Sequence, residues 1–263
     1  MTRQRRIGWL VVLGVLALLA FAVATLPASL LAGSLARAGL TAAAFGGSVW
    51  RGSAQGLAWQ GAPLGDVSWT LTPARLLGRR LAGHATLARP GGSLVTDFDV
   101  ALSGADLRLA DTRFDLPLEA LNALPIGMPK GWRGRASGAV ERFEWADGRP
   151  VALRGALDLD GLVAPPPRNA PLGSFHAVFP HPSPHPSLSV PQDPANLTAQ
   201  VADKGGPFAV DAQLTLNPTT RDFSLEGTLV PREAVPPSMA RSLELLGPAD
   251  ATGRRQFSVG GTL

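Results

Sequence analysis

Residues 94–102 read LVTDFDVAL, so that Phe98 and every second residue around it fall on one side of an extended chain, with Asp97 and Asp99 on the other. Successive side chains of a β-strand point to opposite faces, and this spacing therefore gives one packed face and one wet face. The same alternation recurs in residues 151–159, 208–216 and 223–229. One packed and one wet face is typical of antiparallel sheets. The sequence therefore predicts a mainly β protein.

Glycine and proline separate these stretches along residues 47–263, and the chain contains 30 Gly and 24 Pro. Short strands separated by glycine and proline predict a sandwich, an open barrel or a long curved sheet. We expect three short helices among the strands, at 73–80, 116–124 and 235–246. The proline-rich stretch 180–194, which includes His181 and His185, predicts a long surface loop, with a docking strip for a partner as the alternative.

A weak internal repeat suggests that the β region has two related units, 47–130 and 131–263. WRGSAQG at 50–56 recurs as WRGRASG at 132–138, and APLG at 62–65 recurs at 170–173. Repeated segments of this kind indicate repeated structural units. Chance similarity in a chain rich in glycine and arginine is the alternative.

An uncharged run fills residues 7–26, IGWLVVLGVLALLAFAVATL. At about 1.5 Å per residue, a helix of this length crosses a hydrocarbon core of about 30 Å. Arg3, Arg5 and Arg6 precede the run, so we expect residues 1–6 in the cytoplasm and the remainder of the chain on the far side of the membrane. A cleaved signal peptide is the alternative, although its apolar core is usually about 7–15 residues long. Residues 27–46, with leucines at roughly helical spacing, predict a helical connector.

The residues that support catalysis or cofactor binding are scarce. The chain has no Cys, which excludes disulfides, thiolate metal sites and a cysteine nucleophile. His181 and His185 are four residues apart, but the prolines around them prevent the helix that would turn them to one side. Asp97 and Asp99 are explained by the wet face of a strand, and no nucleophile elbow or phosphate loop is present. We therefore expect no catalytic residue, no cofactor, no metal and no enzymatic activity.

The charge of the chain does not favour nucleic-acid binding. Three of the four net positive charges come from Arg3, Arg5 and Arg6, which leaves the β region nearly neutral. A nucleic-acid-binding domain would carry a basic face. The tryptophans of the β region are expected to pack in the core; the alternative is that they line an apolar groove for lipid or for a partner helix.

Several segments together resemble one family. The opening block GSVWRGSA at 47–54, followed by Leu57, Trp59, Leu64-Gly65, Trp69 and PARLL at 73–77, resembles the start of type II secretion system protein N, also called general secretion pathway protein N. Later segments resemble the same family in the same order: DLPL at 115–118, GRASG at 134–138, DKGGP at 203–207, LGPAD at 246–250 with Gly253-Arg254, and FSVGGTL at 257–263. We expect the family-motif residues to be structural: Trp50, Arg51, Gly52, Trp59, Gly65, Trp69, Trp132, Gly134, Gly253 and Gly260.

The resemblance implies a single-pass protein of the bacterial inner membrane with its N-terminus in the cytoplasm and a periplasmic β domain. It implies an accessory role in the export of folded proteins across the outer membrane, through contacts with other inner-membrane secretion subunits. The family has no established catalytic residues. A lipid-handling protein with an apolar β groove is the alternative function. An envelope hydrolase is a third, but it would need convergent polar residues that the sequence does not offer.

Overall fold

A computed structural model describes residues 21–22, 25–124, 130–167, 169–179, 196–220, 222–232 and 248–262. Within these segments, fourteen strands form one sheet. The strands are β1 (Leu40–Thr41), β2 (Ala44–Gly47), β3 (Arg51–Trp59), β4 (Ala62–Leu71), β5 (Arg80–Arg89), β6 (Gly92–Ala101), β7 (Asp106–Pro117), β8 (Arg133–Ala146), β9 (Arg149–Val163), β10 (Pro171–Phe179), β11 (Leu197–Gly205), β12 (Phe208–Leu216), β13 (Asp222–Pro231) and β14 (Arg255–Thr262).

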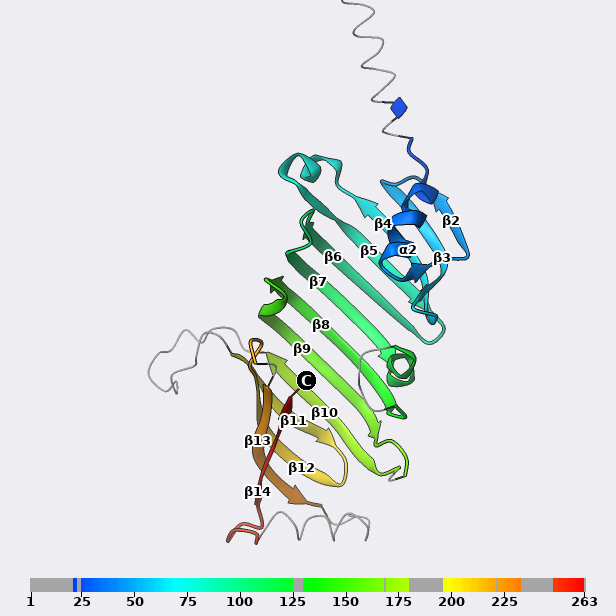
Figure 1. Cartoon of the computed structure of the whole chain (residues 1–263). Helices are drawn as coiled ribbons and strands as arrows, with labels where there is room; N and C mark the ends of the chain where they lie inside the picture. Colours follow the sequence, from blue (N-terminus) through cyan, green and yellow to red (C-terminus); the bar gives the residue numbers. More distant parts are fainter. Residues whose placement is uncertain are drawn as a thin grey trace, which may run out of the picture.

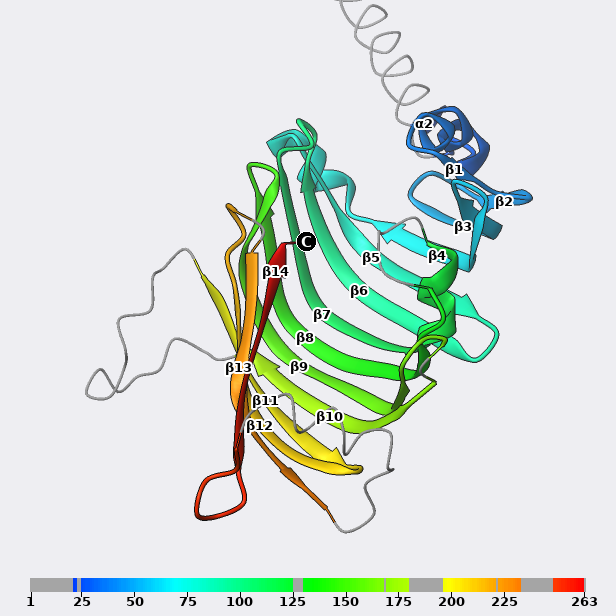
Figure 2. The same ribbon diagram turned by 60° about the horizontal axis from the view of Figure 1, so that its bottom comes forward.

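The sheet is an antiparallel meander in which each strand from β3 onward pairs with the next one along the chain, while β1 and β2 both pair with β3. It is strongly curved, and β11 to β14 turn away from the plane of β5 to β9 (Figures 1 and 2). The prediction of a mainly β, antiparallel protein with few helices is confirmed. Of the three predicted architectures, the long curved sheet is the one found. The expected boundary between residues 47–130 and 131–263 falls between β7 and β8, and these two strands pair along their length.

The described helices are all short: η1 (Ala28–Leu31), α2 (Ala32–Arg37), η2 (Pro73–Gly78) and η3 (Leu118–Ala123). The helix expected at 116–124 begins later, because Leu116 and Pro117 still pair with β8. The segment 27–46, expected to be a helical connector, is helical only up to Arg37. Gly39, at φ 77, then turns the chain so that β1 can pair with Trp59 and Ala58.

Two expected helices fall wholly or almost wholly outside the described residues. The helix at 235–246 lies outside the described residues, as does nearly all of the expected membrane span at 7–26. Within the part of the chain that is described, no helix has both the length and the apolar character needed to cross a bilayer.

Strand register gives the sheet one apolar face and one polar face. Residues directly opposite each other in an antiparallel pair share a face. Successive partners therefore form one row across the sheet from β2 to β14, and every member of the row is apolar: Phe45, Ala54, Val67, Leu87, Leu94, Phe114, Gly138, Leu157, Ala177, Val201, Ala212, Gly227 and Phe257. One residue earlier or later along each strand, the neighbouring row carries side chains such as Ser68, Arg113 and Glu226.

The described segments form no complete second layer over the apolar face. Among the described residues, no large side chain is fully buried, and the buried apolar residues are mostly alanines. The helix η3 covers one part of this face, where Leu118 and Ala120 are 7% and 5% exposed. The large apolar side chains of the row, such as Leu94, Phe114 and Leu157, are only partly buried. Within the described part of the chain, the curved sheet thus leaves much of its apolar surface uncovered.

One buried polar contact lies on the apolar face between β6 and β7. The hydroxyl oxygens of Thr96 and Thr112 are 2.6 Å apart, and both residues are buried. The Thr96 hydroxyl also lies 3.2 Å from the Asp97 carbonyl oxygen. The contact sits where the β6–β7 register shifts, and Asp111 there has a φ of 47°.

We expect Thr96→Val to lower the free energy of unfolding by about 1–3 kcal/mol, because it leaves the buried Thr112 hydroxyl without its partner. The double variant Thr96→Val/Thr112→Val should recover most of the loss, since two apolar side chains of the same shape leave no hydroxyl unpaired. Chemical denaturation of the two single variants and the double variant measures this. Additive losses in the double variant would contradict the coupling.

Candidate interaction surfaces

The first group of family-motif residues gathers at one end of β3 and β4. The indole Nε1 of Trp69 donates to the Val49 carbonyl at 2.8 Å. A Cβ added to Gly52 would lie 2.5 Å from the Trp69 ring, so only glycine fits beneath it. The Trp50 carbonyl accepts from the Leu71 amide at 2.7 Å, and Arg51 begins β3 beside it. These contacts stabilise the hairpin formed by β3 and β4.

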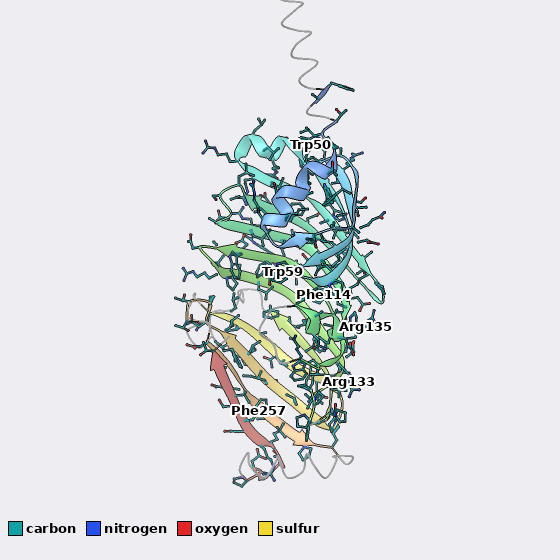
Figure 3. The ribbon with its side chains drawn as sticks, turned by 45° about the vertical axis from the view of Figure 1, so that its right-hand side comes forward. Trp50, Trp59, Phe114, Arg133, Arg135 and Phe257 are labelled. Carbon is teal, nitrogen blue, oxygen red and sulfur yellow. The ribbon has the colours of Figure 1, made fainter. Side chains whose placement is uncertain are left out.

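Other family-motif residues lie elsewhere on the sheet. Trp59 ends β3 and pairs with β1, well apart from Trp50 (Figure 3). A Cβ on Gly65 would lie 2.3 Å from the Ala88 carbonyl oxygen, and one on Gly134 would lie 2.8 Å from the Asp160 carbonyl oxygen. Gly253 occupies a turn at φ 79, and Gly260 lies in β14. The motif residues are therefore spread over the sheet and its turns rather than brought into one site.

Trp132 belongs to a different arrangement, just before β8. The amide nitrogen of Asn122 donates to the Trp132 carbonyl at 3.0 Å, and the Asn122 oxygen accepts from the Gly131 amide at 3.0 Å. The indole Nε1 of Trp132 is buried and has no hydrogen-bond partner among the described residues. Asn122 thus holds the chain after η3 against the start of β8, a role that the sequence alone did not indicate.

This arrangement closes one side of an apolar hollow of about 380 Å³ on the apolar face. The hollow is lined by Phe114, Leu118, Asn122, Trp132, Ala136, Leu157, Leu159 and Leu162. Apart from the Asn122 amide and the Trp132 indole nitrogen, these side chains are hydrocarbon. Pockets of this size and character bind small apolar ligands. Of the tryptophans that were candidates for an apolar groove, Trp132 lies in this lining, while Trp145 is 38% exposed at another part of the sheet.

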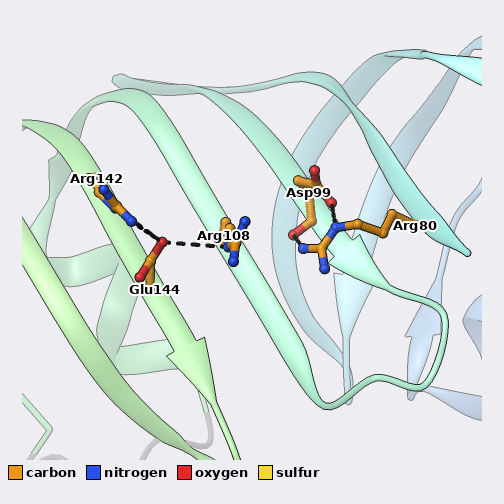
Figure 4. Close-up of polar contacts among 5 residues, drawn as sticks. All are labelled: Arg80, Asp99, Arg108, Arg142 and Glu144. Carbon is orange, nitrogen blue, oxygen red and sulfur yellow. Dashed lines mark hydrogen bonds and ion pairs between the residues drawn. The ribbon is translucent and has the colours of Figure 1, made fainter. Parts of the chain in front are cut away.

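The polar face carries ion pairs both between neighbouring strands and within a single strand (Figure 4). Arg80 Nε lies 2.5 Å from Asp99, and Glu144 accepts from Arg142 at 2.6 Å with Arg108 at 3.5 Å. Asp97, the second carboxylate of the stretch 94–102, lies 2.7 Å from His84 Nδ1. Asp97 and Asp99 thus have separate basic partners and do not form an acid–base pair.

A second ion-pair cluster lies further along the polar face. The Asp158 carboxylate is 2.9 Å from both Lys204 Nζ and His176 Nδ1. The Lys204 hydrogen bond, followed by the one with His176, lowers the pKa of Asp158 below its ordinary value. A larger, mainly polar hollow of about 710 Å³ lies over β12 to β14 on the same face and includes Gln213, Glu226 and Ser258. No group of acidic, histidine and cysteine residues suited to a metal ion occurs in the described segments. His181 and His185 lie outside them.

Comparison with known proteins gives the family. The family model for type II secretion system (T2SS), protein N matches residues 38–258, which include almost the whole sheet. The chain belongs to the type II secretion system protein N family. It is therefore a type II secretion system component, and the resemblance seen in its sequence is confirmed.

A relative from Vibrio cholerae serotype O1 (strain ATCC 39315 / El Tor Inaba N16961), named type II secretion system protein N, is similar throughout. It is 26% identical over 229 residues, and the alignment covers 86% of each chain. No solved structure matches this protein N chain.

The Asp158 cluster generates a prediction about acid stability. Because the folded pKa of Asp158 is lowered, its stabilisation is present above the unfolded pKa of about 3.9 and is lost as pH falls through the folded value. We expect Asp158→Asn to lower the free energy of unfolding by about 0.5–1 kcal/mol at pH 7, because the pair is partly exposed. The difference in free energy of unfolding between the wild type and Asp158→Asn should decrease as the pH falls from 5 to 3.

Denaturant unfolding across this pH range measures the effect. Asp147→Asn is the matched control, since Asp147 lies in the turn between β8 and β9. A deficit for Asp158→Asn that stays constant from pH 7 to pH 3 would show that the ion pairs do not stabilise the fold.

Proposed function

We propose that this protein is an inner-membrane accessory subunit of the type II secretion system, which supports the export of folded proteins from the periplasm across the outer membrane. The observation that carries this proposal is the family match over residues 38–258. The uncharged run at 7–26 and the arginines before it support a single-pass anchor with the sheet in the periplasm.

We further propose that the protein works by contact rather than by catalysis. Carboxylates of the polar face are held in ion pairs with neighbouring strands, as Asp99 is with Arg80 and Glu144 is with Arg108. The sheet offers two surfaces instead: an apolar face that the described segments leave without a full second layer, and a polar face with a hollow over β12 to β14. Contacts with other inner-membrane secretion subunits would use such surfaces.

We expect a clean deletion of the gene to stop secretion of the system's exoproteins and to leave them folded in the periplasm, because the machine would lack a subunit. Immunoblots of culture medium, periplasm and whole cells measure the distribution. Complementation with the full chain is the control, and total exoprotein synthesis should not change. Normal secretion by the deletion strain would overturn the proposal.

A second candidate function is lipid handling, and the apolar hollow is the observation that favours it. The hollow is lined almost entirely by hydrocarbon side chains from β7, β8, β9 and η3, with Phe114 and Leu157 at positions of the apolar row. Burying hydrocarbon surface there would stabilise a bound acyl chain by about 25 cal/mol per Å². Lipid bound on this face would also complete the missing second layer.

Photocrosslinking in intact cells tests the lipid proposal. With p-benzoylphenylalanine at position 114, we expect a lipid adduct on the full chain, because Phe114 lines the hollow. With the same probe at position 113 we expect about tenfold less adduct, because Arg113 lies on the polar face of the same strand. Mass spectrometry of the purified chain measures both. Equal labelling, or none at 114, would rule out lipid in the hollow.

A further inference from the structure

The two edges of the sheet differ in how well they are protected. At the N-terminal edge, β1 and β2 span only 2 and 4 residues, and η1 and α2 lie against them. A bridge between Pro27 and Ser48 covers the end of β2. At the other edge, β14 is a continuous strand of 8 residues whose pairing with β13 has no register shift. Short strands and covering segments protect a sheet edge from pairing with other chains.

The outward-facing backbone groups of β14 can be identified from two hydrogen bonds. The Asn217 amide donates to the Asp222 carbonyl at 2.8 Å, and the Arg232 amide donates to the Pro207 carbonyl at 2.9 Å. Both pairs continue the β12–β13 register, so the even-numbered residues of β13 direct their backbone groups toward β12. The odd-numbered residues of β13 therefore direct their backbone groups toward β14. Their hydrogen-bonded partners are the odd-numbered residues of β14.

The even-numbered residues of β14 then direct their amides and carbonyls away from the sheet. They are Gln256, Ser258, Gly260 and Thr262, and all of them are exposed. No described residue is a backbone partner to these outward groups. Strand β14 contains no proline, no lysine and no bulge, and its one charged residue, Arg255, lies at its first position.

The side chains of β14 would also suit an added strand. Phe257 continues the apolar row, and the neighbouring Val259 on that face is 50% exposed. Gln256 and Ser258 lie on the polar face, opposite Thr228 and Glu226 of β13. A strand with apolar side chains on one face and polar side chains on the other would extend both faces of the sheet.

The position of β14 favours a different chain over a second copy. The Leu26 carbonyl accepts from the Val49 amide and Pro27 bridges to Ser48, so the chain enters the sheet beside β2 and β3, and β14 is at the opposite end of the strand order (Figure 1). With strands about 4.8 Å apart, the two edges are separated by roughly 55–60 Å along the sheet. Two copies joined through β14 would place their N-terminal ends at opposite ends of a doubled sheet. Under the proposed function, the N-terminal ends of both copies lie in the same membrane, which is a constraint on such a pair. A strand from a different protein is not subject to this constraint.

We propose that β14 is the docking edge of this protein, and that it accepts a β-strand of alternating apolar and polar residues from another secretion-system subunit. This inference rests on the proposed function and names its contact. Main-chain hydrogen bonds to residues 256, 258, 260 and 262 hold the added strand, and Phe257 and Val259 select apolar side chains on one face.

The test uses the full chain in secreting cells, with p-benzoylphenylalanine at position 256. We expect a crosslinked product that mass spectrometry identifies as another subunit of the secretion system. Ser258→Pro should reduce this product about tenfold, because proline removes an outward amide and its ring crowds the incoming strand. Ser258→Ala keeps the amide and should leave the product unchanged. The same probe at Ser93, in the middle of the sheet, should give no such product.

Proline is tolerated on an edge strand where its missing amide faces outward, so Ser258→Pro should unfold at the same denaturant midpoint as the wild type. If the denaturant midpoint falls, the crosslinking experiment is repeated with the photoprobe at position 262 and with Gln256→Pro in place of Ser258→Pro. A product containing two copies of this chain would overturn the assignment of the partner. No product, or a product that proline does not reduce, would overturn the docking edge itself.

Secretion separates failure of this inference from failure of the proposed function. If the deletion strain secretes normally, the proposed function fails. If deletion stops secretion but Ser258→Pro secretes normally and no crosslink forms at 256, the subunit assignment stands and the docking edge fails.

Discussion

The structure depends on strand register. A row of apolar residues runs without interruption from Phe45 in β2 to Phe257 in β14, and each step of the row is one antiparallel pairing. A slip of one residue in any pair would move polar side chains such as Arg113 or Glu226 to the apolar face. Register is therefore specified at every strand, even though the segments that the structure describes place no full second layer over the sheet. The interactions between strands must supply most of the order that a sandwich would obtain from packing two sheets.

Strand alternation was sufficient to predict the class of the fold but not its details. Residues 94–102 and 208–216 alternate strictly, and both became strands with the expected faces. In β7, Leu109 and Phe114 share the apolar face although they are five residues apart. The change in register near Asp111 makes this possible, and no simple period would reveal it. Alternation also shows that one face is apolar without showing what covers it, so a sandwich and a single curved sheet could not be separated.

The sequence likewise predicts only part of the two surfaces that are proposed to bind ligands or partners. The sequence resemblance identified Trp132 and Gly134, but the hollow beside them also needs Leu157 and Leu162 from β9 and the fold of η3. Asn122, which ties η3 to β8 through two hydrogen bonds, carries no sequence signal of its own. Likewise, the motif FSVGGTL marked the end of the chain as a family feature, yet only the strand order shows that it forms the outer edge of the sheet. The alternation pattern does not reveal which residues far apart in the sequence come into contact.

The exposed face and the exposed edge offer different kinds of binding. Apolar burial on the face is roughly proportional to area and has little directional preference. Backbone hydrogen bonds at β14 are directional and fix the register of whatever strand they accept. The two surfaces meet, because the apolar row ends at Phe257 in the edge strand itself. A strand added at β14 would therefore carry the next member of the row and enlarge the apolar face by one strand. Docking at the edge and occupancy of the face are thus coupled by the same register that builds the sheet.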